Sequence, residues 1–251
     1  NRATKFRHFA LLGGQNQTVT GNHFFQGDTI ADGIRTAGLI LTSTNCASTV
    51  SDNYIDNCFV EWTNERDARP DFRSGFSFSA LSITDNVFLS GDVAPWFSYI
   101  VVKPFGSGHF LNGMTVSGNK FRSINGSIER AERVDTSFAD LDFSRTRDVF
   151  YEGNTYHNVS AAVANPLRVE HVQGSVARDW TVDTEDLLPC RGQARGVDAI
   201  IALGPIEVSG GADRHALPHA TLRVGSRRDQ VRLTWPEAVR GTVQLMVRVD
   251  R

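Results

Sequence analysis

Charged and aromatic side chains of the kind that recognise sugars are concentrated in three segments, residues 61–73, 96–109 and 129–140. Two carboxyl groups held close together can act as acid and as base or nucleophile in glycoside cleavage. A lysine or arginine beside them can act as a base or neutralise a uronate, and tryptophan rings present broad apolar faces on which sugars can stack. These residue types therefore point to polysaccharide chemistry.

Three residues are predicted to be catalytic: Glu61, Lys103 and Glu129. If the strands that carry them align on consecutive coils, each step brings the next side chain within about 5 Å. The predicted substrate-binding residues are Trp62, Arg66, Arg69, Arg73, Trp96, His109 and Arg130. The alternative is that these mixed-charge loops are solvated surface held by weak ion pairs.

These side chains must be positioned by a repeated unit, and one motif recurs five times. It combines a β-branched residue or Tyr with Ser, Thr or Glu, then Gly or Asp, then Asn, and, two residues after the Asn, an aromatic residue or Ile. The copies begin at Val19, Val50, Ile83, Val116 and Tyr151. Their asparagines, at positions 22, 53, 86, 119 and 154, are 31, 33, 33 and 35 residues apart. A weaker sixth copy spans residues 176–181, with Asp179 in place of Asn.

Each part of the motif has a structural reason. Alternation of a β-branched and a small polar residue is typical of a short strand, and Asn tolerates the left-handed conformation of a sharp turn. A single coil cannot bury its apolar face, but stacked coils can. The repeat therefore predicts a parallel β-helix with stacked asparagines. The spacing and residue pattern do not fit a propeller or a leucine-rich horseshoe.

Two further classes of strand are expected in each coil. One class precedes the motif, at residues 9–11, 39–41, 76–78, 141–143 and 167–169, and the other follows it, at residues 59–62 and 100–103.

The repeated unit resembles the coils of the pectin-lyase-like superfamily, which includes pectate-lyase and polygalacturonase-related proteins, over roughly residues 5–185. The resemblance implies a right-handed parallel β-helix, extracellular or periplasmic, that binds or processes a polysaccharide as a hydrolase or a lyase. Viral tailspikes share the fold, so a non-enzymatic adhesin or tailspike-like stalk is the alternative.

No catalytic residue is carried over from this family. The Asn-x-Asp, Asp-Asp, His-Gly and Arg-x-Lys set of polygalacturonases has no counterpart. Residues 69–73 are similar to the Arg-x-Pro-x-x-Arg motif of pectate lyases, but Ala68 stands where the first arginine would be.

Two domains are expected. Residues 1–189 should form about six coils, with a capping segment that precedes the chain. Residues 190–251 should form a small antiparallel β module, because alternating apolar residues such as Val231, Leu233, Trp235 and Leu245 are separated by turn signals. This module is expected to cap the helix, or to bind carbohydrate or form a homo-oligomer.

Composition limits the partners. The 251 residues carry a net charge of −2, with 40% hydrophobic and 22% charged residues, as in ordinary soluble domains. This balance argues against a nucleic-acid-binding module, and no apolar run is long enough for a membrane span. Cys46, Cys58 and Cys190 lack metal-ligand spacing and are expected to be buried thiols, with a disulfide between two of them as the alternative. His215 and His219 lack a third ligand. No metal or other cofactor is expected.

Overall fold

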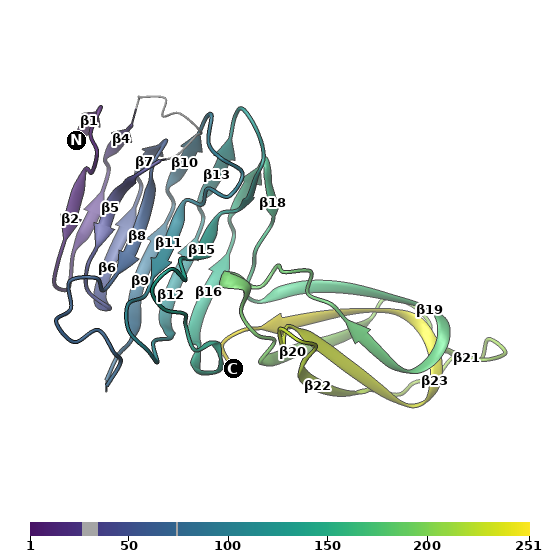
Figure 1. Cartoon of the computed structure of the whole chain (residues 1–251). Helices are drawn as coiled ribbons and strands as arrows, with labels where there is room; N and C mark the ends of the chain where they lie inside the picture. Colours follow the sequence, from purple (N-terminus) through teal and green to yellow (C-terminus); the bar gives the residue numbers. More distant parts are fainter. Residues whose placement is uncertain (27–34, 74) are drawn as a thin grey trace. The chain divides into compact units, whose positions relative to one another are not determined.

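The computed structural model describes residues 1–26, 35–73 and 75–251, which form two compact units, residues 1–163 and 164–251. The first unit is a parallel β-helix of about four turns, and the second contains an antiparallel sheet (Figure 1). The predicted all-β fold, a parallel β-helix followed by an antiparallel module, is confirmed.

Three parallel sheets run along the β-helix. Sheet A contains β1 (Arg2–Thr4), β4 (His23–Phe25), β7 (Tyr54–Asp56), β10 (Val87–Ser90), β13 (Lys120–Ser123) and β17 (Thr155–His157). Sheet B contains β2 (Ala10–Leu12), β5 (Ala37–Leu41), β8 (Phe59–Thr63), β11 (Ile100–Lys103) and β15 (Glu132–Val134). Sheet C contains β3 (Thr18–Thr20), β6 (Asn45–Ser51), β9 (Phe78–Thr84), β12 (Leu111–Ser117) and β16 (Arg147–Glu152). A two-stranded sheet D pairs β14 (Ile128–Arg130) with β18 (Val159–Ala161).

The motif asparagines form the predicted column at the turn between sheets C and A. Nδ2 of Asn22 donates to Oδ1 of Asn53, and the same bond is repeated from Asn53 to Asn86, from Asn86 to Asn119 and from Asn119 to Asn154, at 3.0–3.1 Å. Each Oδ1 also accepts the backbone N–H of the preceding asparagine in the column. Stacked asparagines therefore satisfy buried polar groups that the turns would otherwise leave unpaired.

The motif aromatics stack inside the helix, as their spacing predicts. Phe88 lies 5.1 Å from Phe121, and Phe121 lies 5.7 Å from Tyr156, between ring centroids in stacked geometry. The side chains of Phe24, Ile55, Phe88 and Phe121 are fully buried. This stack forms one edge of the core, and the inward residues of sheets B and C complete it.

Several strand predictions need correction. Residues 9–11 and 39–41 were expected in a different sheet from residues 59–62 and 100–103, but all four segments belong to sheet B. Residues 141–143 lead into the short 3-10 helix η2 (Phe143–Arg145) instead of a strand. Asp142 caps that helix by accepting hydrogen bonds from the backbone N–H and the hydroxyl of Ser144.

The predicted sixth coil and the boundary at residue 189 are wrong. Residues 176–181 lie within β19 (Leu167–Val182), which pairs antiparallel with β23 (Gln230–Arg248) in sheet E. The Asp179 carboxylate has no N–H to donate to an asparagine column and instead accepts a 2.6 Å hydrogen bond from the Thr234 hydroxyl. The helical unit therefore ends at Val163.

The second unit is built around the long strand β23. The strands β19, β20 (Gly196–Ala202), β21 (Glu207–Val208) and β22 (His219–Val224) all pair with it, and η3 (Pro189–Arg191) precedes β20. β23 continues without a break past Pro236. The expected apolar face is present, since Val231, Leu233, Trp235, Val243, Leu245, Val247 and Val249 are buried.

The three cysteines are buried free thiols, as expected. Cys58 packs directly beneath Gly38, where an added Cβ would lie only 2.5 Å from its sulfur. Burial raises the pKa of the Cys58 thiol to about 12, so this thiol is suited to packing rather than reactivity.

Candidate active site

A continuous face of sheet B points outward from the β-helix, and Glu61 lies in it. The register places Glu61 of β8 beside Val101 of β11, and Val101 beside Arg133 of β15. Lys103 lies two residues beyond Val101, so its side chain is on the same face of the sheet. Glu61 and Lys103 are therefore brought together, diagonally across adjacent strands.

Glu129 does not join them. It lies on β14, which pairs with β18 in sheet D and not with the strands of sheet B. The predicted alignment of Glu61, Lys103 and Glu129 is therefore wrong. The chain inserts an additional short strand, β14, between β13 and β15, which shifts Glu129 out of register with Glu61.

Asp135 takes the place that Glu129 was expected to fill. It follows β15 directly, and its backbone N–H bonds to the carbonyl oxygen of Val102, next to Lys103. Burial alone would raise the pKa of Asp135, but hydrogen bonds from the hydroxyl and the backbone N–H of Ser137 outweigh burial and lower it. Arg133 and Lys103 lower the pKa further, so this carboxyl is held as a carboxylate.

The pKa of Glu61 is shifted in the opposite direction. Burial raises it, and the negative charges of Glu65 and Asp135 add to the rise, while Lys103 and His8 oppose it. Glu61 thus favours the protonated form more than an ordinary glutamate does. Two carboxyl groups on one face, with pKa values moved apart by their surroundings, form the arrangement that separates an acid from a base.

Exposed aromatic rings flank the two carboxyl groups. The side chain of Trp96 is 53% exposed, and the Arg133 guanidinium lies 5.7 Å from its ring centroid. Phe138 is 61% exposed and stacks on Phe105 at 4.3 Å, with the Lys103 ammonium 5.2 Å from the Phe138 ring. More than half of each of these two side chains is therefore accessible to a partner in solution.

Trp62 is not part of this surface. Its indole is fully buried, its Nε1–H donates a 2.8 Å hydrogen bond to the carbonyl oxygen of Ser43, and it packs edge-on against Phe78. The expectation that Trp62 stacks on sugar is therefore corrected. Because successive side chains on a strand point to opposite faces, Glu61 and Trp62 cannot both point outward.

His109 is a buried structural residue. Its Nε2 lies 2.6 Å from the carbonyl oxygen of Pro70 and its Nδ1 lies 3.0 Å from the hydroxyl of Ser77. The amide of Asn64 joins the same network: its Nδ2 donates to the carbonyl oxygen of Pro70 and lies 3.3 Å from Nε2 of His109. Predicted as a substrate-binding residue, His109 instead holds the loop after β8 against the helix.

The predicted arginines divide into two groups. Arg130 is 4% exposed and forms a buried ion pair with Glu132, with Nη2 and Oε1 2.6 Å apart, so it does not face a substrate as predicted. Arg66, Arg69 and Arg73 are exposed on the loop that follows β8. Their binding role stays a prediction, because no contact in the described residues places them beside Glu61.

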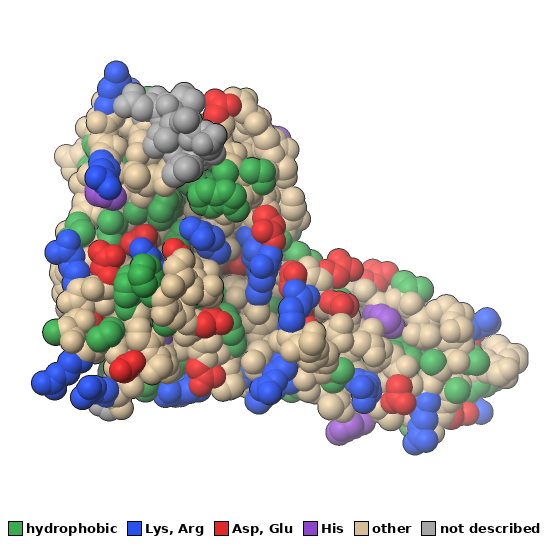
Figure 2. Space-filling model, viewed as in Figure 1, with side chains coloured by type: hydrophobic (Ala, Val, Ile, Leu, Met, Phe, Trp, Pro, Cys, Tyr) green, Lys and Arg blue, Asp and Glu red, His purple; other side chains and the backbone are tan. Residues whose placement is uncertain are grey.

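The remaining surface shows no single dominant charge. Figure 2 shows acidic, basic and hydrophobic side chains interspersed on one side of the molecule. In the part of the chain that the structure describes, no group of three or more His, Cys, Asp or Glu side chains could hold a metal ion. No helix of those residues is long and apolar enough to cross a membrane.

Comparisons with protein-family models, with curated proteins and with solved structures find no match. The parallel β-helix is consistent with the expected fold, and no match supports an assignment to the pectin-lyase-like superfamily.

Proposed function

We propose that this protein cleaves a polysaccharide on the outward face of sheet B, with Glu61 as the proton donor and Asp135 as the second carboxyl group. The proposal rests on one observation: Glu61, whose pKa is raised, and Asp135, whose pKa is lowered, share this face with Lys103. In glycoside cleavage one carboxyl must be protonated and the other ionised at the same pH.

The pKa shifts assign the acid role to Glu61 and the base role to Asp135. The protonated Glu61 gives its proton to the glycosidic oxygen as the bond to the leaving sugar breaks. The Asp135 carboxylate removes a proton from the water that attacks the anomeric carbon. Lys103 stabilises both carboxylate forms and provides a positive charge beside a bound uronate.

The strand geometry favours a water between the two carboxyl groups. Two strand spacings and two residues along the strand separate the Cα atoms of Glu61 and Asp135 by roughly 12 Å. Both side chains extend from the same face, so they can bring the carboxyl groups closer than the Cα atoms, to the separation of about 6.5–9.5 Å that leaves room for the water of an inverting enzyme. Inversion at the anomeric carbon is therefore part of the proposal.

The exposed rings supply the binding surface. Trp96 lies beside Arg133 and Phe138 beside Lys103, so each ring is paired with a cation. A sugar ring can stack on the aromatic face while the neighbouring cation binds its carboxylate or hydroxyl oxygens. An acidic polysaccharide, acted on outside the cytoplasm, is the substrate class that this combination fits best.

The test is product analysis on polygalacturonate, alginate, xylan and arabinan. Mass spectrometry and release of reducing ends should show cleavage by the wild type and at least a hundredfold loss in Glu61→Gln and in Asp135→Asn. Glu152→Gln, which changes an exposed carboxylate on sheet C, is the matched control and should keep full activity.

Three outcomes would contradict the proposal. Unsaturated products would show elimination, with Lys103 as the base, instead of hydrolysis. Full activity in both carboxyl variants would show that Glu61 and Asp135 are not catalytic residues. Binding of these glycans without cleavage would favour the adhesin or tailspike-like alternative.

A further inference from the structure

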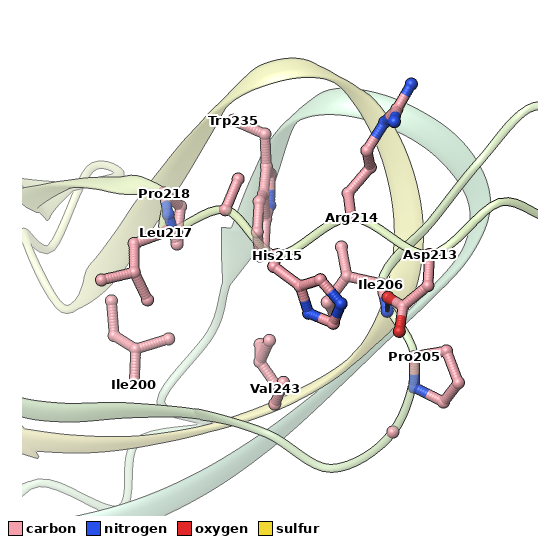
Figure 3. Close-up of a pocket in the computed structure, with 13 residues that line it drawn as sticks. Ile200, Pro205, Ile206, Asp213, Arg214, His215, Leu217, Pro218, Trp235 and Val243 are labelled. Carbon is pink, nitrogen blue, oxygen red and sulfur yellow. Dashed lines mark hydrogen bonds between the residues drawn. The ribbon is translucent and has the colours of Figure 1, made fainter.

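Two features of the described residues lie outside the sheet B face. One is a cavity of about 460 Å³ in the second unit, bordered by Ile200, Leu217 and Trp235 (Figure 3). Its lining is mainly apolar, which does not select a particular ligand. The other is the outward face of sheet C, where polar groups of one kind recur at regular positions.

The outward face of sheet C carries two ranks of hydroxyl groups. In four strands, β3, β6, β9 and β12, a Ser or Thr stands on each side of an inward-facing Val or Ile, as in Thr49-Val50-Ser51. The register of the strands aligns these residues from coil to coil. One rank contains Thr18, Thr49, Ser82 and Thr115, and the other contains Thr20, Ser51, Thr84 and Ser117. Together these residues are called the hydroxyl array.

The hydroxyl array is regular in two directions. Adjacent strands lie about 4.8 Å apart, and alternate residues of one strand lie roughly 6.7 Å apart on the same face. The register is unbroken within the array, and the strands that carry it lie side by side in the β-helix (Figure 1). The array ends at β16, where Phe150 and Glu152 take the two outward positions.

Most of these hydroxyl groups are available to a partner outside the protein. Thr18 and Thr20 are exposed, and the other members are half-buried. Oγ of Ser51 donates a 3.3 Å hydrogen bond to Oγ1 of Thr20, and among the described residues the other members have no side-chain hydrogen bond. Each hydroxyl can both donate and accept. The array therefore offers uncharged donors and acceptors, without the charges and aromatic rings of the sheet B face.

We propose that the hydroxyl array binds the surface of ice. A partner that uses both ranks has to be uncharged and periodic in two directions, and the oxygen atoms of hexagonal ice repeat at similar intervals along its a and c axes. Water molecules held by the array would occupy positions of that lattice, and each can bond both to a hydroxyl and to its neighbours in the crystal. This site does not depend on the cleavage proposed for sheet B.

The β-helix keeps the hydroxyl array in place. The asparagine column fixes each turn next to the array, through bonds such as that from Asn53 to Asn86 at 3.0 Å. Threonine side chains are also restricted at χ1, so their hydroxyl positions are largely set before binding. Many weak contacts on a preorganised frame add up, because little conformational freedom is lost when they form.

The test measures ice-crystal shape and thermal hysteresis, the gap between melting and freezing temperatures, for the full chain in a nanolitre osmometer. The wild type should produce faceted crystals and a gap that widens with protein concentration. Thr49→Tyr and Thr115→Tyr each place a bulky ring in one rank and should reduce the gap at least fivefold. Thr155→Tyr makes the same change on the outward face of sheet A and should keep the wild-type gap.

A second variant tests the array by improving it. Ser82→Thr combined with Ser117→Thr replaces two freely rotating hydroxyls by restricted ones and adds no bulk beyond a methyl group. This double variant should widen the gap at least twofold at equal protein concentration. Its readout does not depend on damage to the fold.

Four outcomes would overturn the proposal. Round crystals with no gap in the wild type would show that the array does not bind ice. An equal loss in Thr155→Tyr would show that the effect is not specific to sheet C, and a narrower gap in the Ser-to-Thr variant would contradict the role of the hydroxyl positions. Adsorption of the wild type to crystalline cellulose or chitin without an effect on ice would assign the array to another lattice.

Discussion

Asn53 and Asn86 lie on adjacent coils, and Nδ2 of Asn53 donates a 3.0 Å hydrogen bond to Oδ1 of Asn86. The same Oδ1 accepts the backbone N–H of Asn53, and Nδ2 of Asn86 donates to the carbonyl oxygen of Val50. One side chain thus satisfies three buried groups of its neighbours. The position of each turn is fixed by the asparagine of the next coil.

Removing one member from the middle of this column should be costly. Asn86→Ala leaves the N–H of Asn53 and the carbonyl oxygen of Val50 unpaired in the interior, which should lower the free energy of unfolding by about 3 kcal/mol. Denaturant unfolding measures this change. Asn154→Ala, at the half-buried end of the column, is the control and should cost clearly less. Equal losses at the two positions would contradict the buried-column explanation.

The two tryptophans that were predicted to bind sugar should behave differently. Trp62→Ala empties a fully buried site and should destabilise the protein by about 4 kcal/mol. Trp96→Ala changes an exposed ring and should alter stability by less than about 0.5 kcal/mol while weakening glycan binding. Thermal unfolding and isothermal titration with a cleaved glycan separate the two effects. Loss of stability in Trp96→Ala with unchanged glycan binding would exclude the stacking role.

Glu61 should make the stability of the protein depend on pH. Its pKa is higher in the folded than in the unfolded chain, so the folded state binds this proton more tightly. The contribution of Glu61 to the free energy of unfolding is therefore fully present below its pKa in the unfolded chain, about 4.3. It is lost as the pH rises through the pKa of Glu61 in the folded chain. Glu61→Gln should raise the unfolding midpoint relative to wild type at pH 7, and this gain should vanish near pH 3. An increase in the unfolding midpoint of Glu61→Gln that becomes larger toward low pH would contradict a raised pKa of Glu61.

Lys103 should lower the pKa of both Glu61 and Asp135. Its positive charge lowers the pKa of Glu61 and also that of Asp135. Lys103→Met should therefore raise both values, which carboxyl 13C chemical shifts followed with pH would detect. Lys120→Met, on sheet A, is the control and should move neither. Unchanged pKa values of both carboxyl groups in Lys103→Met would show that Lys103 does not interact with Glu61 and Asp135.

The β-helix could be predicted from the sequence because its determinants are local and repeated. The same residue types recur at each turn, and Asn22, Asn53, Asn86, Asn119 and Asn154 occupy equivalent positions in the structure. The end of the helix was missed because alternation at residues 167–182 is equally compatible with a parallel coil and an antiparallel strand. The pairing of β19 with β23 joins residues that are 49 to 80 positions apart in the sequence.

The site was predicted only in part. Strand alternation alone could have shown that Glu61 and Trp62 point to opposite faces. Asp135 was not recognised as a catalytic candidate because β14 lies between β13 and β15, and the sequence gives no sign of that insertion. The pKa of Asp135 also depends on the turn that brings Ser137 to its carboxylate, a contact that spacing cannot indicate.

The central claim is that one face of sheet B holds a carboxyl group with a raised pKa, Glu61, and a carboxyl group with a lowered pKa, Asp135. Titration of the Glu61 and Asp135 carboxyl carbons by NMR in the wild-type protein tests it most directly, with Glu61→Gln and Asp135→Asn assigning the two signals. Glu61 should titrate above the ordinary glutamate value of about 4.3 and Asp135 below the ordinary aspartate value of about 3.9. Two ordinary values, or the reverse order, would contradict the assignment of acid and base and the cleavage mechanism built on it.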